Sequence, residues 1–258
     1  ADQEIADKYP KMTVLGKALT TAYYGKPPKY SYFVGFSTGG RQGLSEAQRF
    51  PDDYDAIVAG CPAINWDKFV ICDLWPQVVM NAANDHLSPA KLRAATQAFI
   101  AACDDVDGVK DGVVEDPERC TFDPRVLVGT DVGGSPFTET DAEVLRKIWD
   151  GPRTKDGTLL WYGLSKGADL TTLGAGPFPI AVDWVRYYLV KDRAWNISQL
   201  TPDEFETLFN RSVKDWQEIF GTENPDLTRF RDHGAKIVLL HGQAHQLIMT
   251  EGTIDYSK

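Results

Sequence analysis

Residues 30–43 read YSYFVGFSTGGRQG, and this stretch decides the fold. Its first part, Tyr30 to Phe36, consists of aromatic, β-branched and small residues, which predicts a buried strand. A sharp turn at 37–40 follows, because serine, threonine and two glycines succeed one another there. The stretch from Arg41 to Phe50 then has the character of a helix. The order strand, turn, helix is the context that a strand-end nucleophile requires.

The turn carries a serine in the pattern G-x-S-x-G, at residues 35–39. Small residues on both sides let the backbone turn without a clash, which lifts the Ser37 hydroxyl to the top of the sheet. The backbone amide of Thr38 then points from a helix N-terminus at the oxyanion that develops on a substrate. The alternative is an ordinary glycine-rich turn between strand and helix. The predicted strand before the motif and the predicted helix after it favour a nucleophile.

The flanking sequence predicts an α/β fold with a large insertion. Helical spacing at 12–24, a buried strand at 55–60 and a further strand at 236–242 alternate with the elements above. Such alternation is typical of a parallel sheet with helices on both faces. The predicted parts are a first core part at 1–62, an insertion lying over the sheet at 63–225, and a second core part at 226–258.

Composition excludes two classes of partner. The formal net charge is −10 and the lysines and arginines do not cluster, so we expect no nucleic-acid partner. No apolar run approaches the roughly 20 residues of a membrane helix, so we expect no membrane partner.

The four cysteines favour an oxidising compartment. None forms a CxxC pair, which argues against a zinc ribbon. Cys103 and Cys120 flank an acidic loop and could close it by a disulfide bond. Cys61 and Cys72 are expected to be buried free thiols. Together with two N-x-S sequons at Asn196 and Asn210, these features predict a secreted or extracellular protein.

Residues 30–43 and 50–60 together resemble the tannase and feruloyl esterase family of serine esterases, which has the α/β-hydrolase fold. The likeness continues through the acidic loop to His241 and Gly242. It implies that Ser37 is the acyl-accepting nucleophile and that the Thr38 amide is half of the oxyanion hole. The implied function is a serine carboxylic ester hydrolase for hydroxycinnamate (feruloyl-type) or related phenolic esters. The alternatives are a tannase acting on galloyl esters, and a non-catalytic relative or calcium-bound binding module.

The acidic loop at 103–113 packs four aspartates into eight residues. Hard cations such as calcium prefer several oxygen ligands, and glycines let a loop wrap its carbonyls inward. The loop is not an EF-hand, because Lys110 stands where that motif requires glycine if Asp105 is position one. The alternative is a solvated acidic turn. The resemblance implies a structural calcium ion, with a Cys103–Cys120 disulfide bracing the loop. The implied ligands are the side chains of Asp104, Asp107 and Asp111 and the carbonyl groups of Val109 and Val113.

The end of the catalytic triad departs from the family pattern. Relatives read His-Gly-x-x-Asp after a strand, whereas residues 241–245 read HGQAH, so His245 occupies the position of the triad acid. That acid normally fixes the tautomer of the base and stabilises its charged form. The alternative that His245 is itself the base is disfavoured, because the acid position is one side chain too far from the serine. The sequence ends at Lys258, before the place where relatives carry their base. We therefore expect both ends of the core to be truncated, with companion segments of the same protein completing it.

A second departure concerns Phe36. Most relatives have a cysteine before the nucleophile, bonded to a cysteine that follows the catalytic histidine, and phenylalanine cannot form this link.

The insertion is rich in large aromatic residues, and a planar acyl group needs a flat apolar slot. The segment 177–187 is the best candidate for its lining, although core packing is the alternative for each aromatic residue. The predicted substrate-binding residues are Phe178, Trp184, Arg186 and Tyr187.

Overall fold

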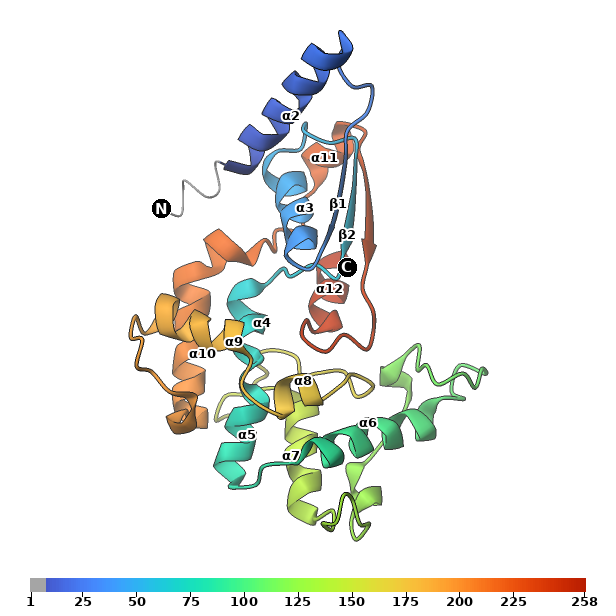
Figure 1. Ribbon diagram of the computed structural model, residues 1–258, viewed down its shortest axis with the longest axis vertical. Coiled ribbons are helices and arrows are strands. Elements are labelled where there is room, and N and C mark those ends of the chain that lie inside the picture. The colour runs from blue at the N-terminus through green and yellow to red at the C-terminus, as the bar shows by residue number, and fades with distance from the viewer. Residues whose placement is uncertain (1–7) are drawn as a thin grey trace. The chain divides into compact units, whose positions relative to one another are not determined.

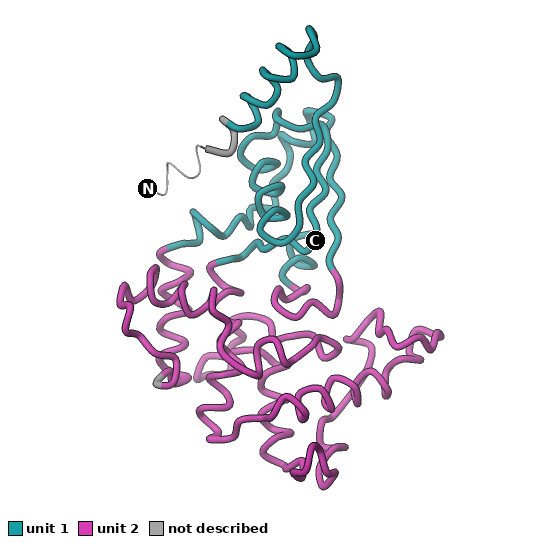
Figure 2. The backbone as a smooth tube through the Cα atoms, in the orientation of Figure 1, with its two compact units in different colours: residues 1–66, 216–241, 252–258 teal, residues 67–215, 242–251 magenta. Residues whose placement is uncertain are grey.

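The computed structural model describes residues 8–258. Backbone contacts divide the chain into two compact units (Figure 2). Unit 1 comprises residues 1–66, 216–241 and 252–258, and unit 2 comprises residues 67–215 and 242–251. The chain thus leaves unit 1 after Trp66 and returns to it at Trp216.

Unit 1 is built on a parallel sheet of three strands in the order β1-β2-β3 (Figure 1). The strands are β1 (Tyr32–Phe36), β2 (Ala56–Gly60) and β3 (Lys236–Leu240). The helical elements of this part of the chain are α2 (Lys8–Tyr24), α3 (Thr38–Arg49), the π-helical turn η5 (Gln217–Gly221), α11 (Thr228–Asp232) and α12 (Thr250–Ser257). The prediction of an α/β fold with a parallel sheet is confirmed.

One face of this sheet is packed and forms the core of unit 1. Helix α3 lies along β1 and β2, and α11 packs against α3. The buried residues of this core are Leu44, Ala47, Ile57, Ala59, Ile64, Phe230 and Ala235. Because α3 places Leu44 and Ala47 on the side that faces the strands, its burial follows from helical spacing.

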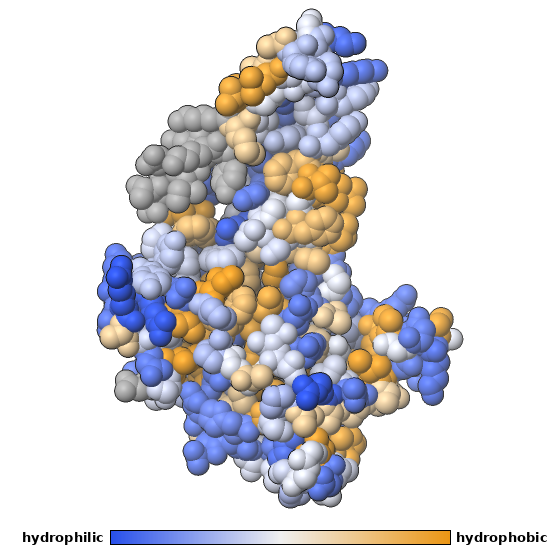
Figure 3. Space-filling model, in the orientation of Figure 1, coloured by the Kyte–Doolittle hydropathy of each residue, from blue (hydrophilic) through white to orange (hydrophobic). Residues whose placement is uncertain are grey.

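The opposite face of the sheet is exposed and apolar in the described chain. Tyr32 and Val34 of β1 are each 64% exposed, and Val238 of β3 is 54% exposed. Figure 3 shows hydrophobic side chains gathered over the strands of unit 1. The prediction of a fully buried strand at 30–36 is therefore wrong for alternate residues, and so is the expectation that helices cover both faces within residues 8–258. Successive side chains of a strand point to opposite faces, and only one face meets α3.

Unit 2 is helical. Its elements are α4 (Trp66–Cys72), α5 (Trp75–Ala83), α6 (Pro89–Cys103), η1 (Pro117–Arg119), η2 (Pro124–Leu127), α7 (Glu139–Asp150), α8 (Thr171–Gly174), α9 (Pro179–Asp183), the π-helical turn η3 (Trp184–Leu189), η4 (Ile197–Gln199) and α10 (Pro202–Trp216). Ser88 caps α6 by accepting a hydrogen bond from the Lys91 amide. The buried Lys91 ammonium pairs with Asp141 of α7 at 2.6 Å, which ties the two helices together. No helix among the described residues is long and apolar enough to cross a membrane.

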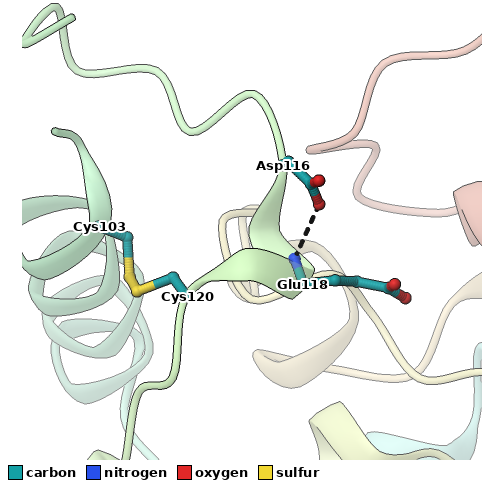
Figure 4. Close-up of a disulfide and its surroundings, with 4 residues drawn as sticks. All are labelled: Cys103, Asp116, Glu118 and Cys120. Atoms are coloured by element: carbon teal, nitrogen blue, oxygen red, sulfur yellow. Dashed lines mark hydrogen bonds between the residues drawn. A yellow bond between two sulfur atoms is a disulfide. The ribbon is translucent and has the colours of Figure 1, made fainter. Parts of the chain in front are cut away.

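A disulfide bond closes the acidic loop of unit 2. It joins Cys103, at the end of α6, to Cys120 (Figure 4). Both cysteines pack in a small core with Phe99. Neither of the other cysteines is in a disulfide bond: Cys72 is a buried thiol as expected, whereas Cys61 is only half-buried.

Candidate active site

Ser37 lies between the end of β1 and the start of α3, and its side chain is exposed. Its backbone has φ 58° and ψ −118°, a conformation that a residue with a Cβ rarely adopts. Three hydrogen bonds hold this conformation. The Ser37 amide donates to the Gly60 carbonyl at 2.9 Å, and the Ser37 carbonyl accepts from the amides of Arg41 at 3.1 Å and Ala63 at 3.0 Å. The turn is therefore fixed from β2 and the loop after it, and it presents the hydroxyl to solvent.

The glycines of the motif are required by close backbone approaches. A Cβ on Gly35 would lie 2.4 Å from the Gly39 carbonyl oxygen. A Cβ on Gly40 would lie 2.6 Å from the Gly60 carbonyl oxygen. Both distances are far below van der Waals contact, so any other residue would push α3 away from the sheet. The spacing of glycines around Ser37 thus has a steric cause in the structure.

Thr38 is the first residue of α3, a helix of 12 residues. The first turn of this helix contains no acidic side chain that would offset the positive end of the helix dipole. Thr38 is exposed beside Ser37 at the start of the helix, as the predicted oxyanion donor requires. The roles of Ser37 and Thr38 in catalysis stay predictions.

His245 lies in the unit 2 segment after β3, and its imidazole is held by the backbone. Its Nδ1 accepts hydrogen bonds from the amides of Leu247 at 3.2 Å and Ile248 at 3.0 Å. Burial lowers the pKa of His245, which favours the neutral ring. A neutral ring that accepts at Nδ1 carries its proton on Nε2. In this tautomer His245 has its N–H at Nε2 and carries no negative charge, so it lacks the acceptor that the predicted triad acid would supply.

The other histidines have local partners or lie at the surface. His241, which follows β3, has its Nδ1 2.7 Å from the Thr253 hydroxyl of α12. His233 lies 3.5 Å from Asp52, and both side chains are exposed. His86 is exposed in the loop before α6.

The acidic loop has the donor types that calcium prefers, but its carboxylates do not converge. Asp104 is buried and accepts from the Gly112 amide at 2.6 Å. Asp107 and Asp111 each accept from the amide two residues further on. No three acidic residues of this loop place carboxylate oxygens within 4.8 Å of one another in the described chain. In this conformation the carboxylates are satisfied by loop amides, so the predicted ligand set would have to rearrange to enclose an ion.

The predicted substrate segment divides into packed and accessible residues. Trp184 is 3% exposed and donates its indole N–H to the Ser212 hydroxyl at 2.9 Å, which favours core packing for this residue. Arg186 donates to the Trp195 carbonyl at 3.0 Å. Phe178 is half-buried at the start of α9, and Tyr187 is half-exposed. Phe178, Arg186 and Tyr187 thus remain accessible for substrate contact.

Sequence reasoning missed two residues of α3. The guanidinium of Arg41 lies over the rings of Trp66 and Phe220, and Glu46 is buried with a raised pKa. The available signal was helical spacing, because Glu46 lies three residues after Gly43, on the small-residue side of the helix that faces the sheet.

Comparison with known proteins shows to which family the chain belongs. The model of the family "Tannase and feruloyl esterase" matches residues 6–258. A probable feruloyl esterase of Arthroderma benhamiae is 41% identical over 95% of this chain and 48% of its own length. Among solved structures, the tannin acyl hydrolase of Aspergillus niger superposes with a TM-score of 0.87 at 26% identity, over 95% of this chain and 49% of that one. Feruloyl esterase B of Aspergillus oryzae superposes with a TM-score of 0.84 at 29% identity, over 95% of this chain and 50% of that one.

The chain spans about half the length of each of these relatives. Tannases and feruloyl esterases hydrolyse carboxylic esters, and the turn at Ser37 lies inside the matched region. The chain therefore belongs to the tannase and feruloyl esterase family.

Proposed function

We propose that this chain is part of a serine carboxylic ester hydrolase for hydroxycinnamate (feruloyl-type) or related phenolic esters. The observation that supports this proposal best is the exposed Ser37 hydroxyl, held at an unfavourable backbone conformation between a strand and a helix N-terminus. A conformation of this kind costs of order 1–3 kcal/mol, and such strain clusters at functional sites.

The proposed reaction has two steps. The Ser37 oxygen attacks the ester carbonyl carbon, its proton passes to a base, and the alcohol departs with a proton to leave an acyl-enzyme. Water then attacks the acyl group, which releases the phenolic acid and restores the serine. The Thr38 amide donates to the oxyanion in both steps. The base of this reaction is not assigned to any residue of this chain.

We further propose that companion segments of a longer polypeptide complete the core and supply the base. Two observations support this. The relatives are about twice as long as this chain, and the outward face of the sheet carries exposed apolar side chains on both β1 and β3. Parallel sheets are normally covered on both faces, and each Å² of apolar surface removed from water contributes about 25 cal/mol.

A tannase acting on galloyl esters is the second candidate, and the fit to the tannin acyl hydrolase favours it. A galloyl group has three phenolic hydroxyls to satisfy, whereas a feruloyl group has one and a methoxy group. Relative rates on methyl gallate and methyl ferulate separate the two. A non-catalytic relative is the third candidate, because Phe36 and His245 both depart from the family pattern.

In the longer polypeptide, which carries the proposed base, we expect a fluorophosphonate to modify Ser37 and no other serine. The base and the helix N-terminus together activate this hydroxyl, and peptide mass spectrometry of the labelled protein identifies the site. Ser37→Ala should abolish labelling, and the matched variant Ser45→Ala on the same helix should keep it. Labelling at no serine would favour a non-catalytic binding module.

We also propose a structural calcium ion in the acidic loop, supported by the four aspartates and the disulfide that closes the loop. The ligands would be Asp104, Asp107 and Asp111 with the carbonyl groups of Val109 and Val113. The ion would order the loop and take no part in ester chemistry.

Calcium at about 100 times its dissociation constant is expected to stabilise the fold by about 3 kcal/mol. Thermal unfolding with added calcium and with EDTA measures this, and Asp104→Asn should remove the difference. Asp105→Asn, outside the ligand set, should keep it. Equal midpoints for the parent chain in calcium and EDTA would refute the site.

Secretion is proposed as well, supported by the Cys103–Cys120 bond, because disulfides form and persist in oxidising compartments.

A further inference from the structure

The chain leaves unit 1 after Trp66 and first returns to it at Trp216, and these two crossings are joined to each other. The Asn65 amide, one residue before the exit at Trp66, donates to the Gly221 carbonyl at 2.6 Å. Asn65 has φ 56° and Thr222 has φ 50°, so both backbones adopt the left-handed conformation that favours glycine. Two strained residues therefore meet at the hydrogen bond that joins these crossings, and neighbouring contacts must hold them there.

Those contacts come from the helix that starts at the proposed nucleophile. The Arg41 guanidinium carbon lies 4.5 Å from the ring centroid of Trp66 and 5.6 Å from that of Phe220. One side chain thus contacts an aromatic ring from each crossing. The guanidinium is planar and delocalised, so it can stack on aromatic rings as an ammonium group cannot.

Further contacts fix the return crossing to the same side of α3. The Gln48 amide group donates to the Thr222 carbonyl at 3.2 Å and to the Tyr256 hydroxyl at 2.9 Å. The Arg49 guanidinium donates to the Glu218 carbonyl at 3.0 Å. Residues 41, 48 and 49 lie seven and eight positions apart, which places them on one face of a helix. The opposite face of α3 packs on the sheet, so the helix connects the strands to both crossings.

We propose that Arg41 is a positioning residue: it fixes both crossings to the first turn of the nucleophile helix and thereby holds the turn that presents Ser37. This inference rests on the proposed function, because it concerns the presentation of the proposed nucleophile. Ser37 and Arg41 are one helical turn apart, and the Arg41 amide donates to the Ser37 carbonyl at 3.1 Å. The side chain that joins the crossings therefore belongs to the turn that presents the serine.

Hydrogen exchange tests the positioning without requiring activity. Arg41→Met keeps the length of the side chain and removes the cation, and it should speed exchange of the Asn65 amide about tenfold. The amides of β2 should exchange at the parent rate. Arg231→Met makes the same chemical change on α11 and should alter neither region. General destabilisation would speed exchange at Asn65 and in β2 alike, and that result would overturn the proposal, as would an unchanged rate at Asn65.

Labelling of Ser37 tests the effect on the nucleophile. In the longer polypeptide, which carries the proposed base, Arg41→Met should slow fluorophosphonate labelling of Ser37 about tenfold, and Arg231→Met should leave the labelling rate unchanged. Arg41→Lys should be intermediate, because an ammonium keeps part of the cation–π attraction but does not stack. An unchanged labelling rate in Arg41→Met would overturn the positioning role. Absence of labelling in the longer polypeptide with Arg41 intact would instead defeat the proposed function, and hydrogen exchange would still decide whether Arg41 holds the crossings.

Discussion

In a polypeptide that carries the full length of the relatives, His245→Asp is expected to raise kcat on methyl ferulate by about four orders of magnitude. His245 accepts two backbone hydrogen bonds at Nδ1, and burial keeps the ring neutral. Its free-energy preference is therefore for the tautomer with the proton on Nε2, whereas the base of a triad needs a carboxylate acceptor. An aspartate at this position would orient the base and stabilise its charged form, and loss of that acid in a serine triad costs about 10⁴ in turnover.

The measurement compares methyl ferulate hydrolysis by three proteins: residues 1–258 alone, the longer polypeptide, and the longer polypeptide with His245→Asp. Residues 1–258 alone should hydrolyse the ester at background rates. His245→Asn in the longer polypeptide is the matched control, because asparagine has the size of aspartate without its charge, and it should leave the rate low. If residues 1–258 turn over at ordinary esterase rates and Ser37→Ala abolishes this, His245 is itself the base.

Glu46→Gln is expected to stabilise the fold by up to about 3 kcal/mol at pH 8 and by little at pH 4. Glu46 is 4% exposed, and its Oε2 has no hydrogen-bond partner among the described residues. Its pKa is raised from 4.5 to about 7, chiefly by burial and also by the nearby Asp53, with Lys17 partly opposing both. Because the folded pKa lies above the unfolded one, the folded state keeps a proton that the unfolded state has already lost between these values. The contribution of Glu46 to the free energy of unfolding is therefore fully present below about pH 4.5 and is lost as the pH rises to about 7.

Urea unfolding at pH 4, 6 and 8 measures this dependence in the parent chain and in Glu46→Gln. The difference between the two isolates Glu46 from His245, whose lowered pKa acts in the opposite direction by reducing stability as the pH falls. Glu143→Gln on the exposed side of α7 serves as the control and should leave the dependence unchanged. If the free energies of unfolding of the parent chain and Glu46→Gln differ by the same amount at all three pH values, the pKa of Glu46 is not raised by folding.

The serine turn could be predicted from the sequence because its cause is local. Gly35 and Gly40 are required by backbone atoms no more than 20 residues away, and this requirement leaves a pattern of glycines around the serine. The disulfide was also accessible, since Cys103 and Cys120 flank one loop. Helix caps such as Ser88 are also local, because the capping side chain and the amide that donates to it are three residues apart.

The exposed face of the sheet could not be predicted, because strands of a parallel sheet are apolar on both sides whether or not a cover is present. Tyr32 and Val34 have the same chemistry in either case. The ring contacts of Arg41 could not be predicted from the sequence for a different reason. Its ring partners, Trp66 and Phe220, lie far along the chain on either side of the insertion, and no local pattern pairs them.

The backbone at Ser37 sets catalysis against folding at a single residue. A glycine would relax φ 58° and ψ −118° without cost, whereas the serine pays for its side chain in every folded molecule. Ser37→Gly should therefore raise the stability of the fold while it removes the hydroxyl on which the proposed ester chemistry depends.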